Sequence, residues 1–335
     1  MDTTSLPTHS APVRPPRPLF DYLPIGLFGS VMGLVGLSIA WQMVSRQYGA
    51  PMWVADTIGA IAVLAFVALL LAYGWKCITA WPAVLAEFRH PVAGSLFGTA
   101  WISFLLVPIV LAKVSPGLAR GVWGIGAIGM TVFAWLIVSR WMGHRQQAIH
   151  ATPAWIVPVV GLLDLPLAMP ALGLEAHAGL AVFALALGLF FTIPLFTMIF
   201  SRLLFEDPIS DAMRPSLMIL VAPFAVGYST YTVVTGHYDV FADALYFLML
   251  FLLVVLGGQM RRLLGGCPFR VSWWSVSFPL AASAICALHY AETHPNPFAN
   301  GVAWLLLAIA SLSILLLLLR TLAGLFTGEL RTLSG

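Results

Sequence analysis

Charged residues are scarce in this sequence, and their scarcity excludes most classes of soluble protein. Of 335 residues only 9% are Asp, Glu, Lys or Arg, 60% are hydrophobic, and the mean hydropathy is +0.95. Soluble domains contain roughly 45–50% apolar residues, so the chain is predicted to lie in a lipid bilayer. The net charge of +3 is too small and too scattered to indicate binding to nucleic acid.

Cysteine and catalytic motifs are also scarce. The 3 cysteines, Cys77, Cys267 and Cys286, have no metal-ligand spacing, and their odd number argues against a disulfide framework, so free thiols are expected. The sequence has no GxxxxGK[ST] phosphate loop and no link long enough for a soluble domain, which argues against direct coupling to ATP. It also has no nucleophile, base and orienting group in a recognisable arrangement. We therefore predict neither an enzyme nor a bound cofactor or metal.

Long apolar runs occupy most of the chain. Residues 1–21 are polar and rich in proline and are predicted to form a disordered cytoplasmic tail without a cleaved signal peptide. Residues 22–327 form the transmembrane domain, and 328–335 a short cytoplasmic tail. Crossing about 30 Å of hydrocarbon takes about 20 residues, which predicts an all-α fold of ten transmembrane helices near Pro24–Val44, Val54–Trp75, Val92–Val114, Leu118–Val138, Ala154–Leu174, Leu180–Phe200, Leu217–Val234, Ala242–Met260, Val271–Tyr290 and Val302–Leu325.

Positive charge is distributed unequally between the two ends of these spans. One set of ends carries 13 of the 16 Lys and Arg residues, and the other carries only Arg46, Lys113 and Arg120. Short cytoplasmic links are enriched in Lys and Arg. Both termini are therefore predicted to be cytoplasmic, with odd-numbered spans running outward and each outward span pairing with the next inward span in one of five hairpins.

Helix breakers recur in the outward spans. They lie about six to nine residues from the cytoplasmic end, a depth of roughly 9–14 Å, at Gly33, Gly98, Pro158, Pro223 and Pro279. One interpretation is that glycine and proline are simply frequent in membrane helices and allow close contact. The other is that the five outward helices bend around one central axis, because a carbonyl freed by a bend must face protein or a water-filled cavity. Pro166, Pro170 and Pro194 show that breakers are not restricted to this depth.

Four short motifs resemble a known family. Residues 24–29 (PIGLFG) resemble its P-x-G-x-F-G start, and residues 85–92 (LAEFRHPV) resemble its A-E-x-R-H-P-V link. Residues 220–223 (LVAP) are similar to its L-A-P motif, and residues 275–278 (SVSF) to its W-x-F-S-F-G motif. These motifs occur in the same order in the tellurite-resistance/dicarboxylate transporter family, which includes bacterial TehA and the slow anion channels of plant guard cells.

The resemblance implies a fold and a function. The family forms five helical hairpins around a central pore, usually as a homotrimer with one pore per subunit, and a phenylalanine in the ninth helix occludes the pore. Phe278 is the matching residue. The expected protein is an inner-membrane pore for small anions, such as dicarboxylates, inorganic anions or oxyanions including tellurite, with the bilayer as its surroundings. The chain departs from the family pattern where Pro279 replaces a glycine, where Ile193 replaces a glutamate, and in residues 161–166 (GLLDLP).

Asp164 is the only ionisable residue near the middle of a predicted span. A carboxyl group at that depth costs about 2.5–3.5 kcal/mol on insertion scales and marks a candidate functional site. Asp164 is therefore a candidate proton or ion site and suggests an alternative, a proton-coupled exporter; a structural role in satisfying the backbone near Pro166 stays open. A third alternative is a membrane scaffold without transport. His289, Glu292 and His294 lie together near one span end, where a solvated loop is favoured over a metal site.

Overall fold

The computed structural model describes residues 20–261, 269–329 and 331. Within these ranges ten helical spans are long and apolar enough to cross a membrane, which confirms the predicted number. The spans are Ile25–Tyr48, Met52–Thr79, Ala93–Leu111, Pro116–Gly143, Pro153–Leu172, Glu175–Phe205, Arg214–Thr235, Val240–Gln259, Val271–Thr293 and Pro297–Phe326. Most of the two predicted tails, together with Arg14, Arg17, Arg262 and Cys267, lies outside the described residues.

Twelve α-helices make up these spans and one link between them. They are α1 (Gly29–Tyr48), α2 (Met52–Thr79), α3 (Trp81–Arg89), α4 (Phe97–Leu111), α5 (Pro116–Gly143), α6 (Val157–Val160), α7 (Met169–Leu172), α8 (Ala178–Phe205), α9 (Ala222–Thr235), α10 (Val240–Arg261), α11 (Ser277–Thr293) and α12 (Pro297–Phe326). The short helix α3 lies in the link between the second and third spans, which the sequence analysis treated only as a motif.

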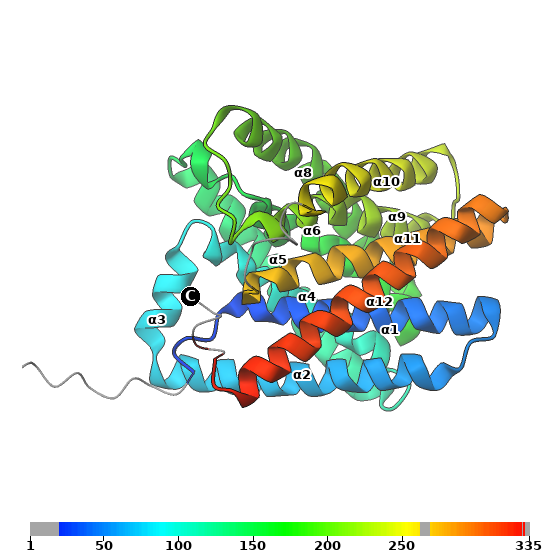
Figure 1. The fold of residues 1–335 in the computed structure, drawn as a ribbon, viewed down its shortest axis with the longest axis horizontal. Helices are drawn as coiled ribbons and strands as arrows, with labels where there is room; N and C mark the ends of the chain where they lie inside the picture. Colours follow the sequence, from blue (N-terminus) through cyan, green and yellow to red (C-terminus); the bar gives the residue numbers. More distant parts are fainter. Residues whose placement is uncertain (1–19, 262–268, 330, 332–335) are drawn as a thin grey trace, which may run out of the picture.

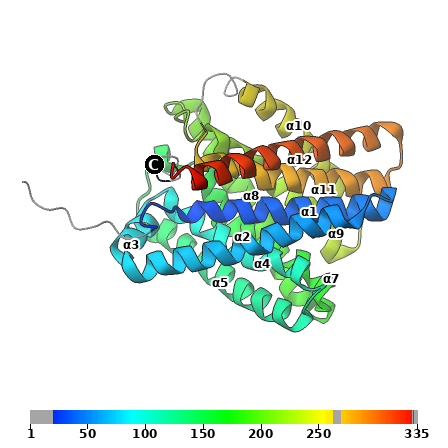
Figure 2. The same cartoon turned by 60° about the horizontal axis from the view of Figure 1, so that its bottom comes forward.

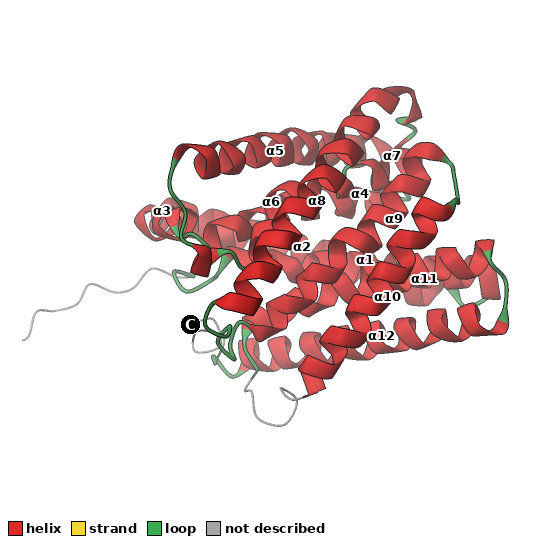
Figure 3. Cartoon of the chain, turned by 90° about the horizontal axis from the view of Figure 1, so that it is seen from above, coloured by secondary structure: helices red, strands yellow, loops and turns green. Residues whose placement is uncertain are grey.

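The ten spans form two layers. In the odd-numbered spans 56% to 89% of the most apolar window is buried, whereas in the even-numbered spans only 22% to 39% is buried. The odd-numbered spans are the inner layer: α1 packs against α4 and α11, α9 packs against α11, and the fifth span lies between α4 and α9. Each even-numbered span of the outer layer packs on the inner span that precedes it, as α12 packs beside α11 in Figure 3. The arrangement is five hairpins closed into a ring in chain order.

All five inner spans begin in the same way. Each starts with a 3-10 segment and then continues as an α-helix. The starting segments are η1 (Ile25–Phe28), η2 (Ala93–Leu96), η4 (Pro153–Ile156), η8 (Arg214–Val221) and η9 (Val271–Val276). A 3-10 segment rises about 2.0 Å per residue with hydrogen bonds to residue i−3, so the inner spans share a change of backbone geometry at one end of the bundle.

The fifth span is not the single regular helix that its apolar run predicts. It consists of η4, α6, η5 (Gly161–Asp164), η6 (Pro166–Ala168) and α7, and prolines occur at Pro153, Pro158, Pro166 and Pro170. Proline removes a backbone donor and prevents regular α-helical bonding. Such irregular backbone is tolerated at membrane depth only when protein or a cavity surrounds it, and 83% of the apolar window of this span is buried.

The two ends of the described chain meet at one end of the bundle. Nη2 of Arg331 lies 3.4 Å from Oδ1 of Asp21, and the Arg331 guanidinium lies 5.2 Å from the centre of the Tyr22 ring. The helix α3 lies at this same end, while the links after α1 and α11 lie at the opposite end (Figures 1 and 2). An even number of spans brings the chain back to the side from which it started.

Candidate functional site

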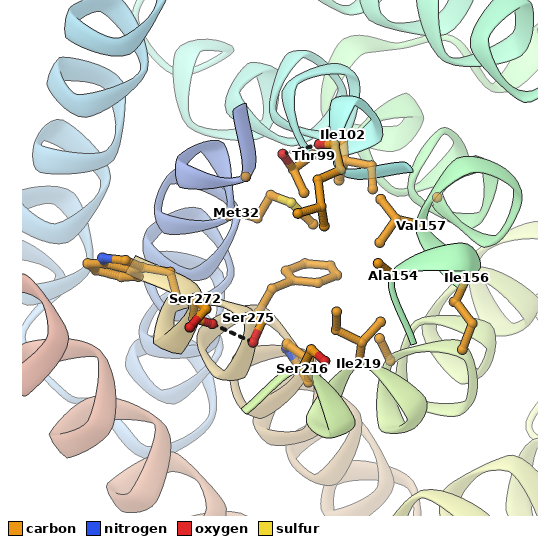
Figure 4. Close-up of a pocket in the computed structure, with 18 of the residues that line it drawn as sticks. Met32, Thr99, Ile102, Ala154, Ile156, Val157, Ser216, Ile219, Ser272 and Ser275 are labelled. Carbon is orange, nitrogen blue, oxygen red and sulfur yellow. Dashed lines mark hydrogen bonds between the residues drawn. The ribbon is translucent and has the colours of Figure 1, made fainter. Parts of the chain in front are cut away.

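A central cavity of about 630 Å³ lies inside the ring of inner spans. Every inner span contributes to its wall, through residues that include Met32, Thr99, Val157, Ile219 and Phe278. Figure 4 shows side chains of Met32, Ile102, Val157 and Ile219 facing one shared opening from different helices. The 3-10 segments of the inner spans supply much of this wall, so the cavity lies toward the end of the bundle that holds the termini.

The cavity wall is mainly apolar. Hydroxyl groups come from Thr99, Ser216, Ser272 and Ser275, and the Ser275 hydroxyl donates to the Ser272 carbonyl at 2.7 Å (Figure 4). Among the described lining residues the only ones with ionisable side chains are His90, Asp164 and Arg270. His90 and Arg270 precede the third and ninth spans, so their side chains are at the mouth of the cavity, and Asp164 lies deeper.

Phe278 is the second residue of α11 and lines the cavity, where it is 8% exposed. Its neighbour Ser277 donates a hydrogen bond to the Trp274 carbonyl at 2.7 Å and to the Gly29 carbonyl at 3.2 Å. These bonds tie the start of α11 to the start of α1. On the facing helix an added Cβ atom at Gly36 would lie 2.9 Å from Cβ of Ala281 and in ordinary contact, at 3.9 Å, with Cδ2 of Phe278, so Gly36 allows α1 and α11 to approach closely beside Phe278.

The three predicted proline breakers lie where 3-10 structure changes to α-helix. Pro158 and Pro223 are the second residues of α6 and α9, and Pro279 is the third residue of α11. At this point backbone bonding changes from residue i−3 to residue i−4, and the first turn of an α-helix has N–H groups without helical partners. Proline, which has no N–H, costs little there. The prolines thus mark the junction and do not interrupt an α-helix halfway along.

The two predicted glycine breakers are points of close helix contact. The helix α1 continues through Gly33, where an added Cβ atom would overlap the side chain of Ser277 in α11. A Cβ atom at Gly98 would lie 2.8 Å from Cγ1 of Val157 in the fifth span. Small residues allow membrane helices to approach closely. Gly33 and Gly98 therefore determine the spacing between neighbouring inner spans.

Hydroxyl side chains bind carbonyls at the 3-10 to α junctions across the inner layer. Thr99 donates to the Ile25 carbonyl at 3.3 Å, and Ser103 donates to the Phe28 carbonyl at 3.2 Å, which joins the third span to the first. Thr230 in α9 donates to the Leu163 carbonyl in the fifth span. Each of these carbonyls lies in a 3-10 segment. Carbonyl groups of the irregular backbone thus receive hydrogen bonds from hydroxyl groups of the neighbouring inner span.

Asp164 lines the central cavity at the end of η5. The residue is 2% exposed, and its Oδ1 atom is buried without a hydrogen-bond partner in the described part of the chain. The adjacent backbone is fixed on both sides, because the Leu163 carbonyl accepts from Thr230 and the Leu165 carbonyl accepts from the Trp123 indole at 3.1 Å. A rigid backbone therefore holds a carboxyl group with spare hydrogen-bonding capacity at the cavity wall.

A buried ionic cluster beside the start of the first span was missed by the sequence reasoning, which counted Lys76 among the charges of the span ends. Glu87 of α3 accepts from Lys76 at 2.8 Å and from Tyr73 at 2.9 Å through Oε2, and from the backbone N–H of Ile25 at 2.7 Å through Oε1. Lys76 also donates to the Leu23 carbonyl at 2.6 Å. The signal was present, since Glu87 is the glutamate of the A-E-x-R-H-P-V motif. Its carboxylate positions the start of the first span.

Glu292 and His294, at the opposite end of the ninth span, have separate partners, and Nδ1 of His289 is buried without a hydrogen-bond partner in the described part of the chain. Glu292 accepts from the Gln47 side chain at 2.8 Å, while the His294 ring stacks on Tyr290 with centroids 4.4 Å apart. His294 Nε2 lies 3.9 Å from Asp243. Within the described ranges no group of three or more His, Cys, Asp or Glu side chains is arranged to hold a metal ion.

The fold and the cavity define a multi-pass membrane protein in which five inner spans enclose one central chamber. Comparison with known families places the chain within this class. Residues 22–322 match the SLAC1 family, described as voltage-dependent anion channel. This protein belongs to that family, which confirms the resemblance found in the sequence; it is a family of anion channels and transporters and not of enzymes.

Curated relatives include plant and bacterial proteins. The chain is 28% identical to the tellurite resistance protein TehA homolog of Haemophilus influenzae, over 96% of this chain and 95% of that protein. It is 25% identical to the S-type anion channel SLAH3 and 24% identical to the guard cell S-type anion channel SLAC1, both of Arabidopsis thaliana, over 90% and 93% of this chain. The chain spans about half the length of these plant relatives, 48% and 57% respectively.

Proposed function

We propose that this protein is a pore through which small anions cross the membrane passively, with Phe278 as the gate. The observation that carries the proposal is the position of Phe278 in the wall of a cavity to which all five inner spans contribute. Membership in a family of anion channels and transporters supports the choice of anions. Dicarboxylates, inorganic anions and oxyanions such as tellurite are the candidate substrates.

The proposed gate works by sterics and by loss of water. Phe278, Met32 and Ile102 line the chamber, and a narrow apolar constriction of this kind blocks ions because it does not stay hydrated. Moving a phenyl group out of an apolar seat costs roughly 1.5–3 kcal/mol. A modest change in the conformation of the ninth span is enough to supply that free energy. Opening of the gate can therefore be regulated.

The mouth of the cavity is suited to bind an anion before the anion reaches the gate. The Arg270 side chain and the hydroxyls of Ser272 and Ser275 line it on the ninth span, and Ser216 lines it on the seventh. A guanidinium group donates charge-assisted hydrogen bonds to anions, whereas the hydroxyls of Ser216, Ser272 and Ser275 already donate to backbone carbonyls and add only polarity to the mouth. We therefore assign the mouth the role of collecting anions ahead of the apolar constriction.

Assembly and orientation are part of the same proposal. We infer a homotrimer with one pore in each subunit, located in a bacterial inner membrane. The excess of Lys and Arg at the end that holds Asp21 and Arg331 supports a cytoplasmic location for this end and for both tails, 1–21 and 328–335. Single cysteines introduced at Arg46 and at Arg320 and labelled with a membrane-impermeant reagent test the orientation: external labelling is expected for the first position only.

A second candidate function is a proton-coupled exporter organised around Asp164. It is favoured by one observation, the buried Oδ1 atom of Asp164 without a partner among the described residues. An ionised Asp164 at about 6 Å from a passing anion repels it by about 3 kcal/mol at an effective dielectric constant near 20. A carboxyl group that gains and loses a proton during transport removes that conflict.

Flux measurements in liposomes separate the candidates. The purified protein is reconstituted with chloride, nitrate, malate or tellurite on one side, and flux is recorded with and without a pH gradient. A reversal potential that follows the anion gradient supports the passive pore, and flux that requires the pH gradient supports the exporter. Absence of flux under every condition supports a membrane scaffold and contradicts both transport functions.

A further inference from the structure

A second cavity, of about 570 Å³, lies between α5 and α8 and shares no lining residue with the central chamber. We call it the α5–α8 groove. Its walls are the last turns of α5, the residues that follow α5, one face of α8, and Trp155 of the fifth span between them. Both helices belong to the outer layer, so the groove faces the surroundings of the protein, which in a bilayer are lipid.

One part of the groove is apolar and is held by aromatic residues. Phe191, Leu195 and Met198 line it from α8. At its floor the indoles of Trp141 and Trp155 stack with centroids 5.2 Å apart, and the Trp155 N–H donates to the Pro91 carbonyl at 2.9 Å. Tryptophan is typical of the interfacial region of membranes. This part of the groove suits a hydrocarbon chain.

The other part of the groove is basic. His144, Arg145 and Gln146 follow the end of α5 and line it, and the described lining includes no Asp or Glu. The Gln146 side chain donates to the His144 carbonyl at 3.0 Å, which fixes the turn. Arg145 is exposed and forms no ion pair within the described ranges. A positive charge without a counterion therefore stands at the edge of an apolar groove.

A second, buried arginine lies at the same end of α8. Arg202 follows Met198 by one helical turn, and residues four apart lie on the same helix face. It is 7% exposed, its Nε donates to the Ile149 carbonyl at 3.4 Å, and its Nη1 is buried without a hydrogen-bond partner in the described part of the chain. A buried guanidinium N–H without a partner is costly. An anionic group is the partner that such a donor prefers.

We propose that the α5–α8 groove binds a membrane phospholipid with an anionic headgroup. The phosphate lies at Arg145 and His144, Arg202 adds the positive charge beneath the turn, and one acyl chain lies along Phe191 and Met198. Basic pockets between transmembrane helices at the cytoplasmic side are suited to anionic headgroups. Charge complementarity selects an anionic lipid over a zwitterionic one. The inference is independent of the proposed transport function.

The test uses the full chain in nanodiscs of phosphatidylcholine alone or with phosphatidylglycerol. Gly143 lines the groove, and a Cβ atom there meets nothing within 4 Å, so Gly143→Trp is chosen to fill the groove. Its matched control is Gly124→Trp, which lies on the same helix outside the groove and where a Cβ atom also meets nothing within 4 Å. The charge variant is Arg145→Ala, with the exposed Arg46→Ala at the other end of the bundle as its control. The readouts are the thermal unfolding midpoint and the lipids retained in native mass spectrometry.

Phosphatidylglycerol is expected to raise the unfolding midpoint of the wild type and of both controls. Gly143→Trp loses this rise together with one retained lipid, and Arg145→Ala weakens retention about fivefold, as expected for one basic residue near an anionic headgroup. Equal retention and an equal midpoint shift in all variants overturn the proposal. A change in oligomeric state in Gly143→Trp with lipid retention unchanged also overturns it, because the groove is then covered by a second copy of the chain.

Discussion

The Nζ atom of Lys76 lies 2.8 Å from Oε2 of Glu87, and the two side chains are only 4% and 13% exposed. Lys76 lies in the last turn of the second span and Glu87 lies in α3, and the same carboxylate accepts from the N–H of Ile25 at the start of the first span. Three chain segments thus meet at one charge pair beside the mouth of the chamber. Both charged groups have further hydrogen-bond partners: Lys76 donates to the Leu23 carbonyl, and Glu87 accepts from Tyr73 and Ile25. A buried ion pair is tolerated under this condition.

Removing one partner of this pair is expected to destabilise the protein. Glu87→Ala leaves the Lys76 ammonium buried and unpaired, a change that costs about 3–5 kcal/mol. Thermal unfolding in detergent measures the effect. The control is Asp56→Ala, which breaks an exposed pair with Lys113 (side chains 53% and 40% exposed), and exposed pairs contribute about 0–1 kcal/mol. Equal unfolding midpoints for the two variants rule out a structural role for the buried pair.

The contact between Gly33 and Ser277 is expected to control the spacing of α1 and α11. Gly33→Ala forces a methyl group into the Ser277 side chain, and overpacking of this kind costs about 1–3 kcal/mol. Gly121→Ala is the control, because a Cβ atom there meets nothing within 4 Å. The unfolding midpoint reports the loss. Ser277→Gly removes the clashing side chain together with its hydrogen bonds to Gly29 and Trp274, so the test is the coupling of the two changes. If the steric account is right, Gly33→Ala lowers the midpoint less in the Ser277→Gly background than in the wild type, and an equal loss in both backgrounds contradicts it.

Asp164→Asn distinguishes the two transport candidates. The substitution keeps the shape of the side chain and removes its ability to carry charge. The passive pore predicts anion flux at least equal to that of the wild type, because any repulsion between a carboxylate and the passing anion is removed. The exporter predicts loss of the flux that a pH gradient drives. Liposome flux at several pH values provides the measurement, and Asp56→Asn, at an exposed helix end, controls for the loss of an acidic residue.

Hydropathy and charge were sufficient to predict the spans and their pairing. The ten apolar runs correspond to the ten helical spans, and the alternation of inner and outer spans follows the five predicted hairpins. These properties depend on length and composition, because a bilayer requires about 20 apolar residues for each crossing. Backbone detail does not depend on hydropathy. The fifth span was expected to be one helix, yet its prolines divide it into short pieces.

Burial of charge was the part that hydropathy and the position of charges along the chain could not predict. Lys76 and Arg202 lie near span ends, where arginine and lysine usually face water, but they are 3% and 7% exposed. Whether a charge is buried depends on partners distant in the chain: Glu87 for Lys76, and the Ile149 carbonyl for Arg202. The role of Gly33 could not be predicted for a similar reason. Its contact with Ser277 joins the first and ninth spans, which are far apart in sequence and become neighbours only when the five hairpins close into a ring.

The most direct test of the account is the anion conductance of Phe278→Ala beside that of Phe66→Ala. Phe66 is buried in the second span at 4% exposure and does not line the chamber, so its variant controls for the loss of a large core side chain. Removing an apolar barrier of roughly 1.5–3 kcal/mol predicts a rise in conductance of roughly 10- to 150-fold for Phe278→Ala, and none for Phe66→Ala. Equal conductance in Phe278→Ala and the wild type, with both proteins folded, contradicts the proposed gate.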